Sequence, residues 1–447
     1  MYKIKGMKYL DNSSKKLFLM ISPKVVGIFA TICAFAISVF RGIENLGVAD
    51  AQGYINQANG VLKGISFVFD DPSAFGHNLG FSYLIAMTFV ISNSTSLLLL
   101  KLILVFSHGI AAYLLAQIGR EIGLKRGAWI AASVLFSLDP FVLYSTTSVG
   151  TENLTTLIVI YWCYLYVIPN SSRSYLSWQV LLFTFSGLFS ILMRPNFLFP
   201  FIFVSILLFT KWRNDQLPAS TLIFSVSLFL ISFSAYELFL TKLNDAFVFL
   251  ATYGGFGIAY ACRPEFIPQY LGIATTEQNE KINYWLNVEN PMQASILAKN
   301  PSLSIVEIDK EMMRLGISTC LENPIESLGI LGLKFFAIWR PFTAVGSYGL
   351  MVFIFSAIIL VPLTYGIARF LFRKNLPARA FSVKKFFIVV SMGFVPSLLI
   401  TTEQLRHRLA FAEPFYWLFS VACIQYWLVS KNSRVTNRKL KRITFRK

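Results

Sequence analysis

Long apolar stretches separated by short polar segments run along most of the chain. A transmembrane helix needs about 20 largely apolar residues, and this pattern predicts a polytopic membrane protein of the all-α class. The ten predicted spans are 22–40, 98–118, 127–144, 153–168, 178–193, 196–210, 219–239, 348–368, 385–401 and 409–429. Phe81–Ile91 and Ile325–Trp339 are apolar but shorter and interrupted, so we expect them to be helices at the membrane interface.

The amino-acid composition agrees with this fold class. Hydrophobic residues make up 55% of the 447 residues, and charged residues make up only 14%. A soluble domain needs roughly 25% charged residues to cover its surface. The deficit excludes an ordinary soluble enzyme, a disordered protein and a disulfide scaffold.

The distribution of basic residues predicts the topology. If the N-terminus is cytosolic, the cytosolic segments contain 26 Lys and Arg but only three acidic residues. These segments are 1–24, 119–126, 169–177, 211–218, 369–385 and 430–447. The long outer connection 240–347 carries 8 basic and 10 acidic residues. The positive-inside rule therefore predicts that both termini are cytosolic.

The net charge of +18 has two interpretations. Either it orients the protein and attracts it to anionic lipid, or the basic tail Lys431–Lys447 binds RNA. Because the basic residues are spread over several loops and do not share one face, we prefer the lipid bilayer as partner and expect no nucleic acid.

The chain divides into parts at the ends of the predicted spans. These are a cytosolic N-terminus (1–21), a transmembrane module (22–240) with a first outer loop (41–97), an outer loop domain (241–347), C-terminal transmembrane helices (348–429) and a cytosolic basic tail (430–447). In the outer loop domain, Ser304-Ile-Val-Glu307 is a capping-box pattern. It predicts a helix that runs to about Glu322 and stops before Asn323-Pro324.

Cysteines occur both in the spans and in the outer loop domain. Cys262 and Cys320 belong to the outer loop domain, where they either form a disulfide in an oxidising compartment or stay as buried free thiols. The sequence favours neither alternative. It contains no C-x-x-C pair and no His/Cys cluster, which argues against a structural zinc site.

Two acidic residues at the predicted outer membrane face are candidates for catalysis. Asp50 lies about ten residues after the first span, and Glu152 lies at the outer end of the fourth. A carboxylate that is partly desolvated in a cleft at headgroup level can act as a general base. The alternative for each residue is a helix cap or a solvated loop acid.

Arginines near the same face are candidates for phosphate binding. Arg406 and Arg408 lie close together, and a guanidinium fork matches phosphate oxygens. Arg194 ends the fifth span, where it either binds phosphate or pairs with an acid. For all three the alternative is snorkelling to headgroups or pairing with a neighbouring acid. The candidate substrate-binding residues are Tyr54, His77, Arg194, Arg263, Arg340, Arg406 and Arg408.

In their order and spacing, several motifs resemble the GT-C superfamily of polyprenyl-phosphate-dependent glycosyltransferases, especially its protein O-mannosyltransferase and aminoarabinose-transferase branch. The matching segments are Asp50 to Tyr54 with Gly76 to Tyr83, Ala112 to Arg126, Asp139-Pro140 with Thr151-Glu152, Gly187 to Pro195, and Arg406-His-Arg408 through Pro414. The resemblance covers most of residues 20–240 and 402–430, whereas 255–325, where acceptor specificity is expected, matches nothing. Many relatives carry a second acid in the first outer loop, and in this chain only Asp70 and Asp71 are candidates for it. Because their match to the family pattern is poor, no cofactor is assigned, and a divalent metal stays an open alternative.

The resemblance implies a GT-C-like fold and an inverting glycosyltransferase. A sugar would move from a polyprenyl-phosphate donor to a glycan, lipid or protein acceptor on the periplasmic side. Asp50 would deprotonate the acceptor hydroxyl, Arg406 and Arg408 would bind the departing phosphate, and Glu152 would orient the acceptor or support Asp50. We expect a bacterial inner membrane, because the chain is compact and shows no retention signal.

Two other functions compete with this hypothesis. A lipid-linked glycan flippase or transporter would use membrane-buried polar residues such as Lys101, His108 and Glu237 along a path. A polysaccharide polymerase or ligase also acts on lipid-linked sugars, often through an Arg/His-rich outer loop, but the loop 241–347 has no His. The candidate acids gather at one face, which favours the transferase.

Overall fold

The computed structural model describes residues 21–47, 51–63, 79–168, 173–215, 218–243, 246–247, 254–271, 273–275, 277–278, 280–281, 291–339, 345–399 and 411–444. The regular structure in these residues is helical, and they contain no strand. The predicted all-α class is therefore confirmed for the described part of the chain.

Within the described residues, six helices are long and apolar enough to cross a membrane. They comprise α2 (Pro23–Arg41), α5 (Leu98–Glu121), α9 (Arg173–Met193), α10 (Leu198–Asn214) with the short η2 (Pro195–Phe197) before it, α11 (Ala219–Leu243) and α19 (Ala378–Leu399). The bent pair α6 (Arg126–Ser137) and α7 (Pro140–Thr147) adds a seventh crossing if it counts as one span. Three further helices overlap the remaining predicted spans, namely α8 (Glu152–Val167), α18 (Val345–Leu371) and α20 (Glu413–Thr444). The apolar helices confirm a multi-pass membrane protein.

The predicted span 127–144 is not one continuous helix, because α6 and α7 meet at an angle of 49°. Pro140 lacks an amide hydrogen and crowds the preceding turn, so it favours a break in the helix at this position. Asp139 caps the new helix by accepting hydrogen bonds from the amides of Phe141 (2.9 Å) and Val142 (3.2 Å). Its second oxygen accepts a hydrogen bond from the indole of Trp417 in α20, at 2.9 Å. Polar side chains thus satisfy the broken backbone inside the bundle.

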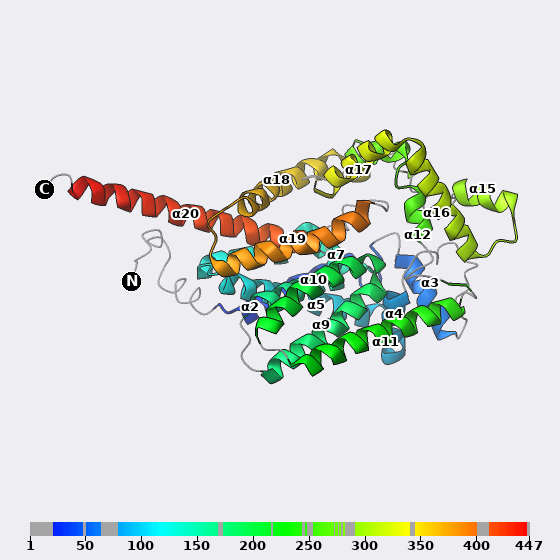
Figure 1. The fold of residues 1–447 in the computed structure, drawn as a ribbon, viewed down its shortest axis with the longest axis horizontal. Helices are drawn as coiled ribbons and strands as arrows, with labels where there is room; N and C mark the ends of the chain where they lie inside the picture. The colour runs from blue at the N-terminus through cyan, green and yellow to red at the C-terminus, as the bar shows by residue number, and fades with distance from the viewer. Residues whose placement is uncertain are drawn as a thin grey trace.

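Most of the outer loop elements labelled in Figure 1 lie toward one end of the molecule. The outer loop elements are α3 (Ala51–Leu62), α4 (Leu79–Ser92), α12 (Gly254–Ala259), η3 (Pro264–Phe266), α13 (Ile267–Leu271), α15 (Pro291–Lys299), α16 (Ile305–Glu322) and α17 (Pro324–Trp339). In Figure 1, α3, α12, α15 and α16 appear at the right, whereas the C-terminal part of α20 extends at the left. The two short apolar stretches are thus helical, as α4 and α17.

The connections rich in basic residues contact one another near the other end of the helices. Arg126 donates a hydrogen bond to the carbonyl of Ile21 at 2.6 Å. Arg379 forms an ion pair with Glu121, and the amide of Lys125 donates to the Gln425 side chain at 2.7 Å. Three of the six segments that the sequence analysis assigned to the cytosolic side, 1–24, 119–126 and 369–385, are therefore neighbours in the structure.

The outer loop domain has a small hydrophobic core of its own. Its buried residues come from α12, η3, α13, α15, α16 and α17, and they include Tyr260, Phe266, Tyr270, Ile296 and Met312. A disulfide joins Cys262 to Cys320 at the end of α16, with their Cα atoms 5.3 Å apart. Of the two alternatives for these cysteines, the structure records the disulfide.

Helix α16 begins at the predicted capping box. The Ser304 amide donates to the Glu307 carboxylate (2.8 Å), and the Glu307 amide donates to the Ser304 hydroxyl (3.4 Å). The hydrogen bond from the Ser304 hydroxyl holds the pKa of the Glu307 carboxyl below its usual range. The helix ends at Glu322 and the next begins at Pro324, so both boundary predictions are confirmed.

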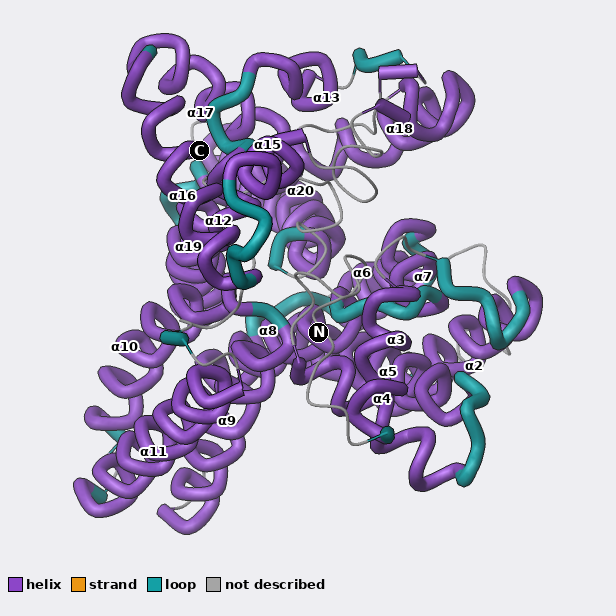
Figure 2. Tube along the Cα trace, turned by 90° about the vertical axis from the view of Figure 1, so that its right-hand side faces the viewer, coloured by secondary structure: helices purple, strands orange, loops and turns teal. Residues whose placement is uncertain are grey.

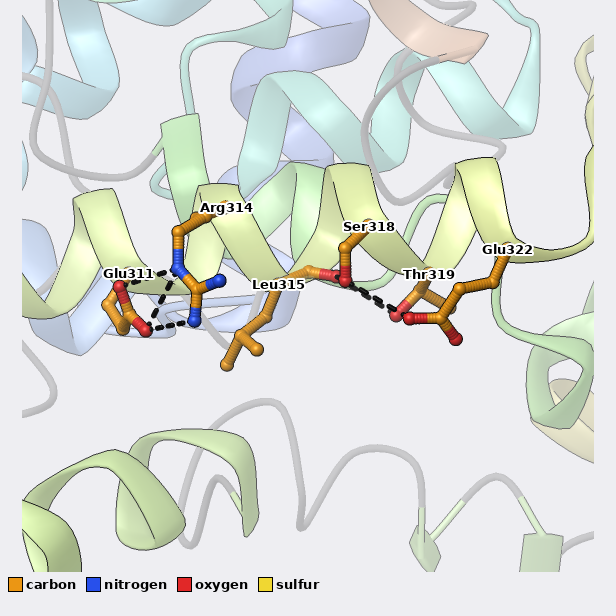
Figure 3. Close-up of polar contacts among 6 residues, drawn as sticks. All are labelled: Glu311, Arg314, Leu315, Ser318, Thr319 and Glu322. Atoms are coloured by element: carbon orange, nitrogen blue, oxygen red, sulfur yellow. Dashed lines mark hydrogen bonds and ion pairs between the residues drawn. The ribbon is translucent and has the colours of Figure 1, made fainter.

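Figure 3 shows polar contacts along the exposed face of α16. Arg314 forms an ion pair with Glu311, and Ser318 contacts the Glu322 carboxylate at 3.3 Å. The hydrogen bond from Arg314 lowers the pKa of the Glu311 carboxyl. These contacts connect residues of one solvated helix, so they contribute little to stability.

Replacing both Cys262 and Cys320 by Ser is expected to loosen the outer loop domain and to leave the transmembrane core intact. The bond closes a loop with a sequence separation of 58, and the chain-entropy model gives it up to about 4 kcal/mol. Limited proteolysis should cut the double variant between α12 and α17 faster than the wild type. Cys423→Ser, which removes a free thiol, is the control. Equal cleavage rates in all three proteins would contradict a stabilising bond.

Candidate functional site

A polar segment (residues 145–156) comprises the end of α7, the connection to α8 and the start of α8, and it is buried. Its buried polar residues are Ser145, Thr146, Thr147, Ser148, Thr151, Glu152, Asn153, Thr155 and Thr156. Burial of so many polar groups costs free energy unless they are hydrogen bonded. The hydroxyls of Ser145 and Thr146 donate to the carbonyl of Val142 (2.7 and 2.9 Å), and the Asn153 amide donates to the carbonyl of Leu104 in α5.

The polar segment is buried because α8 is an interior helix. It packs against α5, α9, α10 and α19, and Figure 2 places it between the group that contains α5 and the group that contains α9 and α10. The N-terminal end of α8 therefore lies among other helices, and Glu152, its first residue, is only 3% exposed.

Glu152 and Arg194 form a buried ion pair. Arg194 directly follows α9, and its Nη2 lies 2.5 Å from Oε1 of Glu152. Its Nε donates a hydrogen bond to the Thr151 hydroxyl. The carboxylate also lies in the first turn of α8, where the helix dipole favours a negative charge. Of the two roles predicted for Arg194, the structure shows the pairing with an acid.

The first outer loop packs directly against the polar segment. The Val149 amide donates to the carbonyl of Leu46 at 2.7 Å, and the Tyr144 hydroxyl donates to the carbonyl of Gly47. A Cβ atom on Gly47 would lie 2.3 Å from the Ser148 hydroxyl oxygen. Gly47 precedes Asp50 by three residues and Ser148 precedes Glu152 by four. The two segments that lead to the predicted acids therefore contact each other.

Replacing Gly47 by Ala is expected to destabilise this contact more than Gly42→Ala does elsewhere in the same loop. Both glycines have positive φ, at +80° and +89°, but a Cβ on Gly42 would meet nothing within 4 Å. Gly42→Ala should therefore cost only the left-handed strain, about 1–2 kcal/mol. Gly47→Ala must also displace Ser148, which adds about 1–3 kcal/mol. Thermal unfolding of the detergent-solubilised variants measures the difference, and equal losses would contradict the close packing.

Two cations lie beside this contact. Arg41, the last residue of α2, donates to the hydroxyl of Thr147 and stacks on the Tyr144 ring at 4.3 Å. Lys101 in α5 donates to the carbonyls of Asn45 (2.8 Å) and Thr147. The sequence analysis did not select Arg41, although a cation at this end of a span opposes the orienting rule as Arg194 does.

Lys334 is a second residue that the sequence analysis did not select. It lies in α17, is fully buried, and donates to the carbonyls of Leu399 (2.7 Å) and Ala261 (3.4 Å). Its ammonium also lies 5.7 Å from the centre of the Tyr270 ring. A lysine within an apolar interfacial stretch was the available signal, because a buried charge requires partners. Lys334 connects the outer loop domain to the end of α19.

The other predicted site residues are dispersed or lie outside the described residues. Tyr54 is buried, with its ring 4.9 Å from that of Phe81 in α4. Arg263 lies 3.9 Å from Glu265 in the outer loop domain and does not contact the Glu152–Arg194 pair. The residues outside the described part of the chain are Asp50, His77, Arg340, Arg406 and Arg408.

A metal site is not formed by the described residues, which contain no group of three His, Cys, Asp or Glu side chains suited to hold an ion. Asp50, Asp70 and Asp71 lie outside the residues searched, so the alternative of a divalent metal stays a hypothesis.

The side chains of two residues proposed for a transport path contact backbone carbonyl oxygens. Lys101 donates to the two carbonyls named above, and the ring of His108 contacts the carbonyl of Ser137 at 3.3 Å, at the end of α6. The His108 contact fits a structural role at the break between α6 and α7, and the Lys101 contacts connect the end of α7 to the first outer loop. They give the transporter hypothesis no support.

No family model, curated protein or solved structure matches this chain.

Proposed function

We propose that this protein is a membrane glycosyltransferase that moves a sugar from a polyprenyl-phosphate donor to a glycan, lipid or protein acceptor. The observation that carries the proposal is the packing of the first outer loop on the polar segment. Gly47, three residues before Asp50, contacts Ser148, and the same segment continues into the buried Glu152–Arg194 pair. The described segments that lead to the predicted base and to the predicted supporting acid thus contact each other, which supports the proposal.

In the proposed reaction Asp50 accepts the proton of the acceptor hydroxyl while the hydroxyl oxygen attacks the anomeric carbon. The bond between that carbon and the phosphate oxygen breaks, and polyprenyl phosphate leaves with the electron pair. A single displacement inverts the anomeric centre. Arg406 and Arg408 bind the departing phosphate and stabilise its growing negative charge.

Glu152 is a positioning residue in this proposal. Its carboxylate is engaged by Arg194, and Arg194 also bonds Thr151. The pair holds the start of α8 and, through Val149, the first outer loop that carries Asp50. Because the interaction is buried, it fixes the loop more firmly than a solvent-exposed pair would.

The proposed topology has ten spans in a GT-C-like fold. The spans are α2, α5, the pair α6 and α7, α8, α9, α10, α11, α18, α19 and α20. Both termini are then cytosolic, and the outer loop domain lies on the periplasmic side of a bacterial inner membrane. The neighbouring basic loops support this orientation, and so does the Cys262–Cys320 disulfide, since disulfides persist in oxidising compartments.

The test is to locate the phosphate of a bound polyprenyl-phosphate analogue. A photoreactive analogue should label the wild-type protein in nanodiscs near Arg406 and Arg408. Labelling should fall in the Arg406→Gln and Arg408→Gln variants. Arg314→Gln, which changes an exposed arginine of α16, should label like the wild type. Absent labelling, or labelling at a distant segment that these variants leave unchanged, would overturn the assignment.

A further inference from the structure

We propose that Arg41, Tyr144 and Lys101 form a binding site for the phosphate of a membrane lipid. Both cations lie next to one residue, since Arg41 donates to the Thr147 hydroxyl and Lys101 donates to the Thr147 carbonyl. Among the described residues neither cation makes an ion pair, whereas four other arginines do. Two cations held together in this way attract an anion.

The guanidinium of Arg41 is held in place but keeps donors for a ligand. Its Nη1 contacts the Thr147 hydroxyl and the Tyr144 carbonyl, the latter at 3.4 Å. The guanidinium lies over the Tyr144 ring, and its Cζ is 4.3 Å from the ring centre. Within the described residues, Nε and Nη2 have no hydrogen-bond partner. An immobilised arginine with two free donors is suited to bind phosphate oxygens in a bidentate way.

The charges of the neighbouring groups favour an anionic ligand. The ammonium of Lys101 is buried, with 2% of the residue exposed, and interacts electrostatically with Arg41 and Glu44. The Glu44 carboxylate accepts hydrogen bonds from the Ser96 hydroxyl (2.7 Å) and from the Leu97 amide (3.3 Å) at the start of α5. Among the described residues, one carboxylate, already engaged, thus interacts with Lys101 beside two cations, and a phosphate would balance the excess positive charge.

The location of the site indicates that the phosphate belongs to a lipid. Arg41 is the last residue of a helix suited to cross a membrane, so its guanidinium lies at headgroup level. Its neighbour Phe40 is 88% exposed and Tyr144 is 46% exposed. The other exposed apolar residues of α2 continue this surface along the helix. Figure 2 shows α2 next to α5 and α7 on the right of the molecule. An acyl or prenyl chain can therefore follow α2 while its phosphate contacts Arg41.

The site is independent of sugar transfer. It is separate in sequence from Arg406 and Arg408, and it would bind a lipid phosphate even if the protein were not a transferase. A polyprenyl phosphate and a phosphodiester lipid share the chemistry that the site recognises. The experiment therefore compares the two lipids.

Binding is measured by native mass spectrometry of the full chain in detergent, with decaprenyl phosphate and phosphatidylglycerol as the two probes. Arg41→Gln should weaken binding of at least one lipid by about tenfold or more, since charged hydrogen bonds to phosphate are lost. Loss with decaprenyl phosphate alone identifies a carrier-lipid site, and loss with both identifies a general lipid-phosphate site.

Arg369→Gln is the matched control. Arg369 also stacks on a tyrosine, Tyr365, at 6.0 Å, but within the described part of the chain no buried lysine contacts it. Its replacement should leave both affinities unchanged. Tyr144→Leu is a second test that removes the aromatic platform and keeps Arg41, and it should also weaken binding. Unchanged affinities in Arg41→Gln and Tyr144→Leu, or equal losses in Arg369→Gln, would overturn the proposal.

Discussion

Replacing Asp50 by Asn is expected to leave the protein folded and to lower sugar transfer by about 100- to 10,000-fold, the usual contribution of a general base. The amide keeps the size of the side chain but cannot accept the acceptor proton at neutral pH. Binding of the lipid-linked donor should stay close to that of the wild type, because the donor phosphate is assigned to Arg406 and Arg408.

The rate is measured in membranes with a panel of polyprenyl-phosphate sugars, and the folded state is checked by thermal unfolding. Glu322→Gln serves as the control. Glu322 is an exposed acid of α16, and its side-chain hydrogen bond within the described residues is to Ser318. It should transfer sugar at the wild-type rate. An Asp50→Asn variant with wild-type turnover would remove Asp50 from the mechanism.

Replacing Arg194 by Met is expected to lower stability by about 3–5 kcal/mol, because it leaves the buried Glu152 carboxylate without its cation. The side chains of Arg194 and Glu152 are only 12% and 4% exposed, so water replaces the lost partner poorly. Glu152→Gln should also destabilise the protein, since it leaves the guanidinium buried. The double variant should lose less than the sum of the single losses, because neither charge then remains.

Unfolding midpoints of the four proteins, measured in one detergent, give the coupling between the two residues. The exposed pair Glu311 and Arg314 provides the control cycle, and its coupling should be much smaller than that of the buried pair, because solvent screens it. Additive losses at Glu152 and Arg194 would show that the ion pair does not stabilise the fold. If Glu152 positions the first outer loop, each single variant should also transfer sugar more slowly than the wild type. This decrease should remain when the rate is calculated per molecule of folded protein.

The sequence was sufficient to predict the long apolar helices and α16, because local chemistry determines them. It did not predict α3, α12, α13 and α15 or the break between α6 and α7. In a membrane the backbone must satisfy its hydrogen bonds internally, so an apolar stretch of sufficient length becomes a helix. The boundary between α16 and α17 follows from the Ser304–Glu307 capping box and from Pro324, which are short-range signals. The same patterns identified Glu152 and Arg194 as residues at span ends.

Only the tertiary structure decided which of these residues meet. Arg194 lies 42 residues after Glu152, and α8 buries the pair because it packs against helices from distant parts of the chain. The disulfide between Cys262 and Cys320, the carbonyl partners of Lys334 and the juxtaposition of Arg41 with Lys101 depend on packing in the same way. No local pattern encodes such contacts, since many arrangements of the same helices bury a similar apolar area. The packing of the helices decides which polar groups lie close enough to form hydrogen bonds and ion pairs.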